Sequence, residues 1–368
     1  MPKKHLLSVL LQLCLCQLAV AQPERLLGGD LSLLPSYEEQ GAVYRTPDGR
    51  AVELLPYLRQ QGWNAVRVRL FVEPQYAPEK HRQEGVCQDL DYVLRLGCRV
   101  KQAGFRLMLD LHYSDYWADP GKQTMPHRWL DTRREDLPDS VYQYTRRTLA
   151  ALCRRGVVPD LIQVGNETTN GMLWPLGRLE WNQPSSWDYL CQLYQAGCRA
   201  CREVCPKAQV IIHTEKAGDW DVTKTYYQQL RRHGVDYDII GLSYYPMWHG
   251  TIENLGQNLD RLAWLFPEKE VMIVETAAYY SHENDRWSTP DKYSEFYPIT
   301  VDGQTQFTRE LVDELNRHSN VRGLFWWFAE ENAAGNTLLT CWVNRGLFDN
   351  HTGCALPALT IFSRFTTK

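Results

Sequence analysis

Two glutamates that each follow a strand-like apolar run are the residues of this sequence best suited to act together in catalysis. Glu167 follows the run 161–165 in LIQVGNE, and Glu275 ends the run 271–275 in VMIVE. Two carboxyl groups can serve as proton donor and nucleophile when their surroundings separate their pKa values. In retaining glycosidases such groups lie about 5–5.5 Å apart, so the pair suits that chemistry if the fold brings the two side chains face to face.

Polar or aromatic side chains also stand where the other predicted strands end. They are Asp30, Arg67 with Arg69, Asp110 with His112, Asn166, His213, Tyr244 with Tyr245, and Trp326 with Trp327. Each has a structural explanation when taken alone, such as an arginine paired with carboxylates inside the fold or a hydrogen-bonded core histidine. Their coincidence at every strand end favours a functional site there.

Strand-like runs alternate with helical patterns along the chain, which is typical of α/β architecture. The predicted strands are Leu26–Asp30, Ala65–Phe71, Phe105–His112, Leu161–Gly165, Val210–Thr214, Ile239–Tyr245, Val271–Glu275 and Gly323–Trp327. The predicted helices are Glu53–Gln61, Asp89–Ala103, Ser140–Arg154, Trp187–Val204, Thr223–His233, Thr251–Phe266 and Gln306–Asn316. We therefore expect a single (β/α)8 TIM barrel over residues 22–368, with Glu167 and Glu275 on its fourth and seventh strands. A doubly wound open sheet is the alternative, but the glycine-rich motifs GxGxxG and GxxxxGK expected of it are absent from the sequence.

The composition argues against two classes of partner. Forty Lys and Arg residues stand against 44 Asp and Glu, which gives a formal net charge of -4. We therefore expect no attraction to nucleic acid or to an anionic membrane surface. The 13 Trp and 20 Tyr residues are more than a core of this size needs. Aromatic faces that bind sugar rings and plain core filling are both open interpretations for each tryptophan.

Residues 1–21 have the features of a secretory signal peptide. Lys3 and Lys4 precede an apolar run that is short for a membrane span, and Ala19-Val20-Ala21 supplies a small-x-small cleavage site before Gln22. A lipoprotein anchor at Cys14 or Cys16 fits less well, because a leucine precedes each cysteine. We expect a secreted, periplasmic or cell-surface protein with no membrane span.

Four cysteines share one face of a predicted helix. Cys191, Cys198, Cys201 and Cys205 are spaced seven, three and four residues apart. We interpret them as small buried residues on the core face, with or without a disulfide, because a single CxxC is a weak signal for a metal site. The metal-binding motif HExxH is also absent, and no motif suggests a nucleotide or redox cofactor, so we expect no cofactor for the chemistry. The absence of GxSxG argues against a serine esterase.

Four stretches of the chain resemble the endo-β-1,4-galactanases of glycoside hydrolase family 53. They are LDLHYSDYWADPGKQTMP (109–126), QVGNETTNGMLWPLGR (163–178), IIGLSYYPMWHGT (239–251) and VMIVETAAYY (271–280). Weaker similarity occurs in GGDLS near residue 28, VRVRLFVEP (66–74), GLFWWF (323–328) and GLFDNHTGCALPAL (346–359). The resemblance therefore covers nearly all of residues 22–368.

This resemblance implies roles for individual residues. It implies Glu167 as acid/base and Glu275 as nucleophile of a double displacement on the β-1,4-galactan side chains of pectin. Asn166 would hold the 2-hydroxyl of the sugar, with Arg67 and Tyr245 beside the nucleophile. Further substrate-binding residues are expected at Asp30, His112, Trp117, Trp174, His213, Trp248 and Trp327, and no metal takes part in the chemistry.

Two segments depart from the family pattern. Trp326-Trp327-Phe328-Ala329 stands where the family commonly has Tyr-Trp-Glu-Pro, with Glu330 and Glu331 following, and the segment 277–280 (AAYY) replaces an aromatic residue followed by proline. We expect both changes to affect distal subsites rather than cleavage. Several bacterial members bind calcium after the seventh strand. Oxygen ligands there are Glu283, Asn284, Asp285 and Asp302, so a structural calcium and a plain solvated loop are both open.

Two other functions remain as alternatives. One is a retaining barrel glycosidase acting on a different β-1,4-glycan, such as mannan or cellulose. The other is a non-catalytic glycan-binding protein, against which the presence of Glu167, Glu275 and Asn166 argues. The expected partners are galactan and galacto-oligosaccharides, and we expect a monomer because no exposed heptad or repeat suggests an assembly surface.

Overall fold

Eight parallel strands close into a barrel in the computed structural model, which describes residues 24–283, 294–333 and 343–366. Their order around the ring is β1-β10-β9-β8-β7-β6-β5-β4, and β1 pairs with β4 to complete it. The strands are β1 (Leu26–Asp30), β4 (Ala65–Leu70), β5 (Arg106–Leu111), β6 (Leu161–Val164), β7 (Gln209–Thr214), β8 (Ile239–Ser243), β9 (Glu270–Thr276) and β10 (Val321–Trp326). The predicted (β/α)8 barrel is confirmed. The predicted signal segment 1–21 lies outside the described residues.

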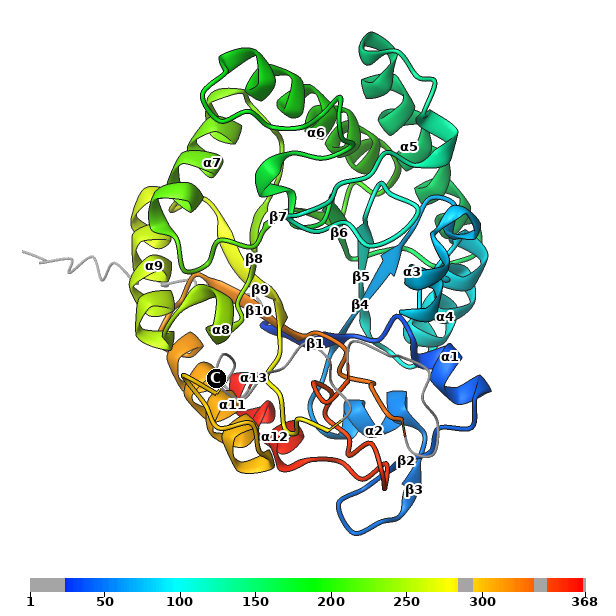
Figure 1. Cartoon of the computed structure of the whole chain (residues 1–368), viewed down its shortest axis with the longest axis vertical. Helices are drawn as coiled ribbons and strands as arrows, with labels where there is room; N and C mark the ends of the chain where they lie inside the picture. The colour runs from blue at the N-terminus through cyan, green and yellow to red at the C-terminus, as the bar shows by residue number, and fades with distance from the viewer. Residues whose placement is uncertain (1–23, 284–293, 334–342, 367–368) are drawn as a thin grey trace, which may run out of the picture.

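The longer helices surround the barrel on its outer side, and short helices lie in the segments before and after them (Figure 1). They are α1 (Leu34–Glu39), α2 (Leu54–Gln60), α3 (Glu79–Gln83), α4 (Leu90–Gln102), α5 (Leu137–Arg154), α6 (Pro184–Val204), α7 (Trp220–Arg232), α8 (Pro246–His249), α9 (Ile252–Leu265), α11 (Val301–Leu315), α12 (Pro357–Ile361) and α13 (Ser363–Thr366). The longer helices match the predicted ones. Several begin at a side-chain cap, as where Asp89 accepts a hydrogen bond from the backbone N–H of Tyr92 in α4. The short helices α1, α3, α8, α12 and α13 were not predicted, because fewer than two turns show no apolar period.

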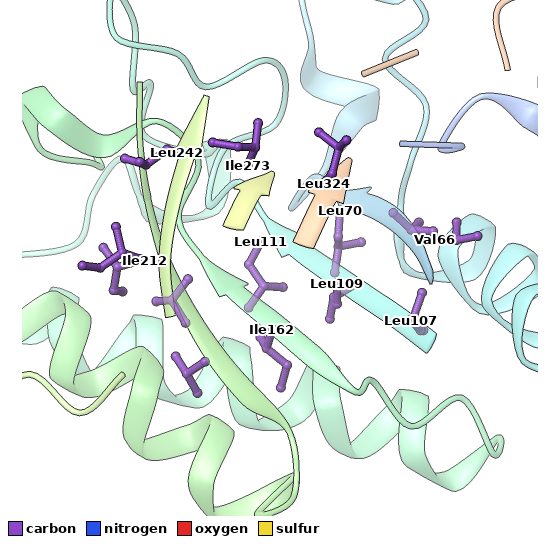
Figure 2. Close-up of a cluster of buried hydrophobic side chains, with 14 of the residues drawn as sticks. Val66, Leu70, Leu107, Leu109, Leu111, Ile162, Ile212, Leu242, Ile273 and Leu324 are labelled. Atoms are coloured by element: carbon purple, nitrogen blue, oxygen red, sulfur yellow. The ribbon is translucent and has the colours of Figure 1, made fainter. Parts of the chain in front are cut away.

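The two faces of each barrel strand have different surroundings. Outward side chains such as Val66, Leu109 and Ile162 pack between the strands and the helices (Figure 2). Inward side chains form a small apolar cluster that fills the lower barrel: Leu26, Ala65, Met108, Leu161, Ile211, Ile239, Met272, Val274 and Phe325. Above it, towards the carboxyl ends of the strands, the alternation continues with polar residues such as Arg67 and Gln163. A layer of charged and polar side chains therefore lies directly above the inward-facing apolar cluster.

A two-stranded hairpin, β2 (Tyr44–Arg45) with β3 (Ala51–Val52), lies outside the barrel. It joins the C-terminal part of the chain, since the Arg45 N–H donates to the Gly353 carbonyl at 2.8 Å and Arg45 accepts from the Ala355 N–H at 2.9 Å. Strands of two residues carry no periodic signal, so this hairpin was not predicted.

Two other expectations concern α6 and the membrane. Cys191, Cys198, Cys201 and Cys205 are buried, which confirms the core-face interpretation, and all four are free thiols. Cys205 lies beside Cys153 of α5, with the two sulfur atoms 3.5 Å apart. Within the described ranges, every helix is too short or too polar to cross a bilayer.

Candidate active site

A cavity of about 360 Å³ opens at the carboxyl ends of the barrel strands. Eight of the residues named from the sequence line it: His112, Trp117, Asn166, Glu167, Tyr245, Trp248, Glu275 and Trp327. Trp248 is 57% exposed and lies at the rim, whereas Trp327 is 8% exposed and forms part of the wall. The size and the mixed polar and aromatic lining are typical of a small-molecule or sugar site.

Glu275 ends β9 and is held by two donors. Arg67 Nη2 lies 2.8 Å from its Oε1, and the Tyr245 hydroxyl donates to its Oε2 at 3.1 Å. Burial raises the pKa of Glu275 to about 7, although Arg67 acts in the opposite direction. Burial also raises the pKa of Tyr245 well above its usual value, so the phenol keeps its proton and donates it. Arg67 and Tyr245 thus both lie beside Glu275.

Glu167 follows β6 in a left-handed backbone conformation, with φ 47° and ψ 53°. A non-glycine residue adopts this conformation at a cost, so neighbouring groups must hold it. Gln123 does so, because its Nε2 donates to the carbonyl of Asn166 at 2.8 Å and to that of Glu167 at 3.2 Å. The turn directs the Glu167 carboxyl group into the cavity that Glu275 also lines.

The pKa of Glu167 lies well above its usual value. Burial is the largest cause, followed by the charges of Glu275 and Glu215, while a hydrogen bond from Ser243 acts in the opposite direction. Arg67 stabilises the Glu275 carboxylate, whereas the charges of Glu275 and Glu215 oppose ionisation of Glu167, so we expect Glu275 to lose its proton first. One glutamate is therefore ionised over a pH range in which the other keeps its proton.

Arg67 connects the nucleophile candidate to the layer beneath it. Its Nη1 lies 3.0 Å from Asp30 Oδ2, and its Nη2 lies 2.8 Å from Asp110 Oδ2 and 2.9 Å from Asn166 Oδ1. Asp30 and Arg67 are buried below the cavity and are not among its lining residues. Their placement favours a role in orienting Glu275 and Asn166, and direct substrate contact by them stays an untested prediction.

Two further predicted binding residues also lie away from the cavity surface. His213 is fully buried, and its Nε2 lies 2.8 Å from Ser243 Oγ. Trp174 is half-buried, donates from Nε1 to the Asn170 carbonyl at 2.9 Å, and lies under the guanidinium group of Arg178. Neither residue lines the cavity.

The cavity also has polar lining residues that the sequence analysis did not name as binding residues: Asp119, Glu215, Lys216, His249, Tyr279 and Arg345. Glu215 follows β7 directly, so the strand-end rule could have found it. Its Oε2 accepts from the Thr169 hydroxyl at 2.7 Å, and its Oε1 lies 2.9 Å from Lys216 Nζ. The sequence gives no comparable indication for Arg345, because this residue lies in a loop well after the end of β10.

The glutamates after β10 turn away from the cavity. Glu331 accepts hydrogen bonds from the backbone N–H groups of Asn344, Arg345 and Gly346 at 2.6–2.8 Å. This anchor holds the Arg345 guanidinium group over the Trp327 ring, 5.5 Å from its centroid. Phe328 is fully buried and packs against Arg69. Phe328 and Ala329 do not line the cavity, so this departure from the family pattern leaves both candidate catalytic glutamates in place.

The calcium expectation falls partly on residues 284–293, so Asn284 and Asp285 lie outside the described structure. Glu283 Oε2 lies 2.7 Å from His351 Nε2, and Asp302 is exposed in the first turn of α11. In the portion of the chain that the structure describes, His, Cys, Asp and Glu side chains form no group of three that could hold a metal ion. Calcium binding stays a prediction.

Comparison with known proteins places the chain among glycoside hydrolases. Residues 26–362 match the model of Glycosyl hydrolase family 53. An endo-beta-1,4-galactanase from Bacillus subtilis is 33% identical over 308 residues, covering 82% of this chain and 68% of that protein. An arabinogalactan endo-beta-1,4-galactanase from Thermothelomyces thermophilus is 31% identical over 345 residues, covering 92% of this chain and 98% of that protein.

Solved structures agree with this assignment. A GH53 catalytic domain from Ignisphaera aggregans superposes with a TM-score of 0.83 and 29% identity, over 94% of this chain and 97% of the other. A fungal beta-1,4-galactanase gives a TM-score of 0.77 and 30% identity, over 92% of this chain and 99% of the other. A xylanase from Thermobacillus composti, at 12% identity and a TM-score of 0.59, shares the fold alone. The chain belongs to glycosyl hydrolase family 53 and is a glycoside hydrolase.

Proposed function

We propose that this enzyme cleaves β-1,4-galactosidic linkages within galactan, with retention of anomeric configuration. The substrate class rests on the relatives, which are named galactanases and arabinogalactan endo-galactanases. The mechanism rests on the two glutamates in one cavity and on their unequal electrostatic surroundings. We further propose that residues 1–21 direct export and that the mature chain begins at Gln22.

In the first half of the reaction, Glu167 acts as the acid and Glu275 as the nucleophile. The Glu275 carboxylate attacks the anomeric carbon and forms an ester bond, while Glu167 transfers its proton to the departing glycosidic oxygen. Arg67 and the Tyr245 hydroxyl orient the Glu275 carboxylate for this attack. Trp327 and Trp117 in the cavity wall offer apolar faces to the sugar rings.

In the second half, Glu167 acts as a base. Its carboxylate takes a proton from water, the water oxygen bonds to the anomeric carbon, and Glu275 leaves as a carboxylate. Asn166 is fixed for binding the 2-hydroxyl, because its Oδ1 accepts from Arg67 and its Nδ2 donates to the Ala118 carbonyl at 2.8 Å. The enzyme then returns to its starting protonation state.

One observation carries the assignment of roles. Arg67 lies 2.8 Å from Glu275, whereas the neighbours of Glu167 include the carboxylates of Glu275 and Glu215. Arg67 and the Tyr245 hydroxyl stabilise the Glu275 carboxylate, whereas the charges of Glu275 and Glu215 oppose ionisation of Glu167, so we infer that Glu275 ionises first. This order is the one that a nucleophile and an acid require.

The test is digestion of debranched galactan, with mannan, cellulose and xylan in parallel and product sizes followed over time. We expect short galacto-oligosaccharides from galactan alone. Glu167→Gln should lose most turnover while still binding galactan. Glu270→Gln is the matched control, since Glu270 lies at the opposite end of the same strand as Glu275, beside Arg322.

Three outcomes would change the proposal. Galactan binding without cleavage by the natural chain would make it a glycan-binding protein. Cleavage of another polymer would replace the substrate. Full activity of Glu167→Gln would remove that residue from the acid role.

A further inference from the structure

The carboxyl group of Glu167 is held on one side by a fully buried hydroxyl. Ser243 ends β8, has no exposed surface, and donates to Glu167 Oε1 at 2.6 Å. A carboxyl oxygen that accepts so short a hydrogen bond is a poor place for a proton. The acid proton of Glu167 is thereby directed to Oε2.

The Ser243 hydroxyl has one hydrogen, so it can donate to Glu167 only if it accepts, rather than donates, in its other hydrogen bond. Its second partner is His213 Nε2, at 2.8 Å. Because a neutral imidazole carries one ring proton, the direction of this contact depends on which nitrogen of His213 holds it. The partner to which Ser243 donates its hydroxyl hydrogen therefore depends on the tautomer of His213.

The surroundings of His213 Nδ1 favour the proton on Nε2. The Glu167 N–H donates to Nδ1 at 3.4 Å, and Gln163 Nε2 lies 3.1 Å from the same nitrogen. Asn166 Oδ1 is also 3.0 Å away, but it already accepts from Arg67 Nη2 at 2.9 Å and from Gln163 Nε2 at 3.1 Å. Nδ1 thus acts as an acceptor, and the Nε2–H group donates to Ser243.

The same ring stays uncharged. Burial, with the charge of Arg67 nearby, holds the pKa of His213 well below its usual value. A neutral His213 with its proton on Nε2 leaves the Ser243 hydrogen for Glu167. The hydrogen-bonded chain therefore runs in one direction, from His213 through Ser243 to Glu167.

We propose that Ser243, oriented by His213, is a positioning residue that keeps the acid proton of Glu167 on Oε2, the oxygen not occupied by Ser243. The inference rests on the proposed acid/base role of Glu167. In the second half of the reaction the same hydroxyl stabilises the Glu167 carboxylate, which then acts as base. His213 thus contributes to catalysis from behind the cavity wall, without touching the sugar.

The test compares Ser243→Ala with the natural enzyme on two aryl β-galactobiosides, followed by kcat/KM. One carries 2,4-dinitrophenol, which departs without protonation, and the other carries phenol, which needs the acid. We expect Ser243→Ala to lose about 10- to 100-fold on the phenyl substrate and little on the dinitrophenyl substrate. The alkaline limb of its pH profile should move to higher pH, because a lost donor raises the pKa of Glu167 and the acid is active when protonated.

Two further variants keep the result interpretable. Ser243→Thr retains a hydroxyl and should recover most of the loss. Ser114→Ala is the matched truncation control, because Ser114 is also buried and its hydroxyl has no hydrogen-bond partner among the described residues. Thermal melting of each variant tests whether the fold is intact.

Equal losses of Ser243→Ala on both substrates, or an unmoved alkaline limb, would overturn the inference while leaving the proposed function standing. An inactive natural enzyme would instead contradict the proposed function itself.

Discussion

Replacing Arg67 with Gln should disturb both the stability and the pH dependence of the enzyme. The guanidinium group is buried and lies 2.8–3.0 Å from carboxylate oxygens of Asp30, Asp110 and Glu275. Breaking a buried ion pair by removing one partner costs about 3–5 kcal/mol. The loss of unfolding free energy therefore depends on whether the three carboxylates keep other partners when Arg67 is removed.

The lower end of that range applies because each carboxylate keeps another partner. Asp30 retains Arg69 at 3.1 Å, Asp110 retains His112 at 2.9 Å, and Glu275 retains the Tyr245 hydroxyl at 3.1 Å. We expect a loss of about 3 kcal/mol in the free energy of unfolding. For a domain of this size that corresponds to a fall in Tm of about 4 °C.

The pH profile gives the functional readout. Glu275 must be ionised to attack, so kcat/KM falls as pH drops through its pKa of about 7. Arg67 stabilises the ionised form, and its removal should raise this acid limb by about one to two pH units. Arg67→Lys is the control, because it keeps a positive charge in the same place and should move the limb less.

The assays are thermal melting and kcat/KM on soluble galacto-oligosaccharides between pH 5 and 9. A lower Tm with an unmoved acid limb would show that Arg67 only supports the fold. An acid limb displaced to lower pH would contradict the electrostatic reasoning.

Three further predictions test other parts of the molecule. Burial raises the pKa of Glu330 to about 8, so the folded state holds this proton more tightly than the unfolded state and loses stability as pH rises. Glu330→Gln should therefore reduce the fall in Tm between pH 6 and pH 9, and an unchanged fall in Tm would contradict this. Incubation with glutathione disulfide should link Cys153 to Cys205, because their sulfur atoms lie 3.5 Å apart and the residues are 52 positions apart in the chain. The disulfide should stabilise the fold by on the order of 4 kcal/mol. Peptide mapping and Tm measure the two effects, with Cys153→Ser as the control. Glu331→Gln should release the loop that carries Arg345 and raise KM for galacto-oligosaccharides more than it lowers kcat, and an unchanged KM would show that the loop does not shape the binding wall.

The fold was predictable because the barrel strands are apolar on both faces of their lower halves, and their runs stand out between helical patterns. Glu167, Glu275, Tyr245 and Trp327 were found by the rule that sites of such barrels lie at the strand ends, whereas Trp117 and Trp248 were expected only from the family resemblance. That rule does not say how deep a side chain lies. Arg67 and His213 stand at strand ends in the sequence but are buried beneath the cavity, because inward residues form successive layers.

Contacts between distant loops set the rest of the site. Arg345 enters the cavity only because Glu331 binds the backbone around it. Ser243 gains significance only through its contacts with Glu167 and His213. Neither contact leaves a periodic or motif signal, so these residues could be recognised only in three dimensions.

The most direct test of double displacement by Glu167 and Glu275 is the configuration of the first product. Hydrolysis of a reduced-end galacto-oligosaccharide is followed by proton NMR at times short compared with mutarotation. A new reducing end that first appears as the β-anomer is the predicted result, because two displacements at one carbon restore its configuration. First appearance of the α-anomer would mean a single displacement by water, and would exclude Glu275 as a covalent nucleophile.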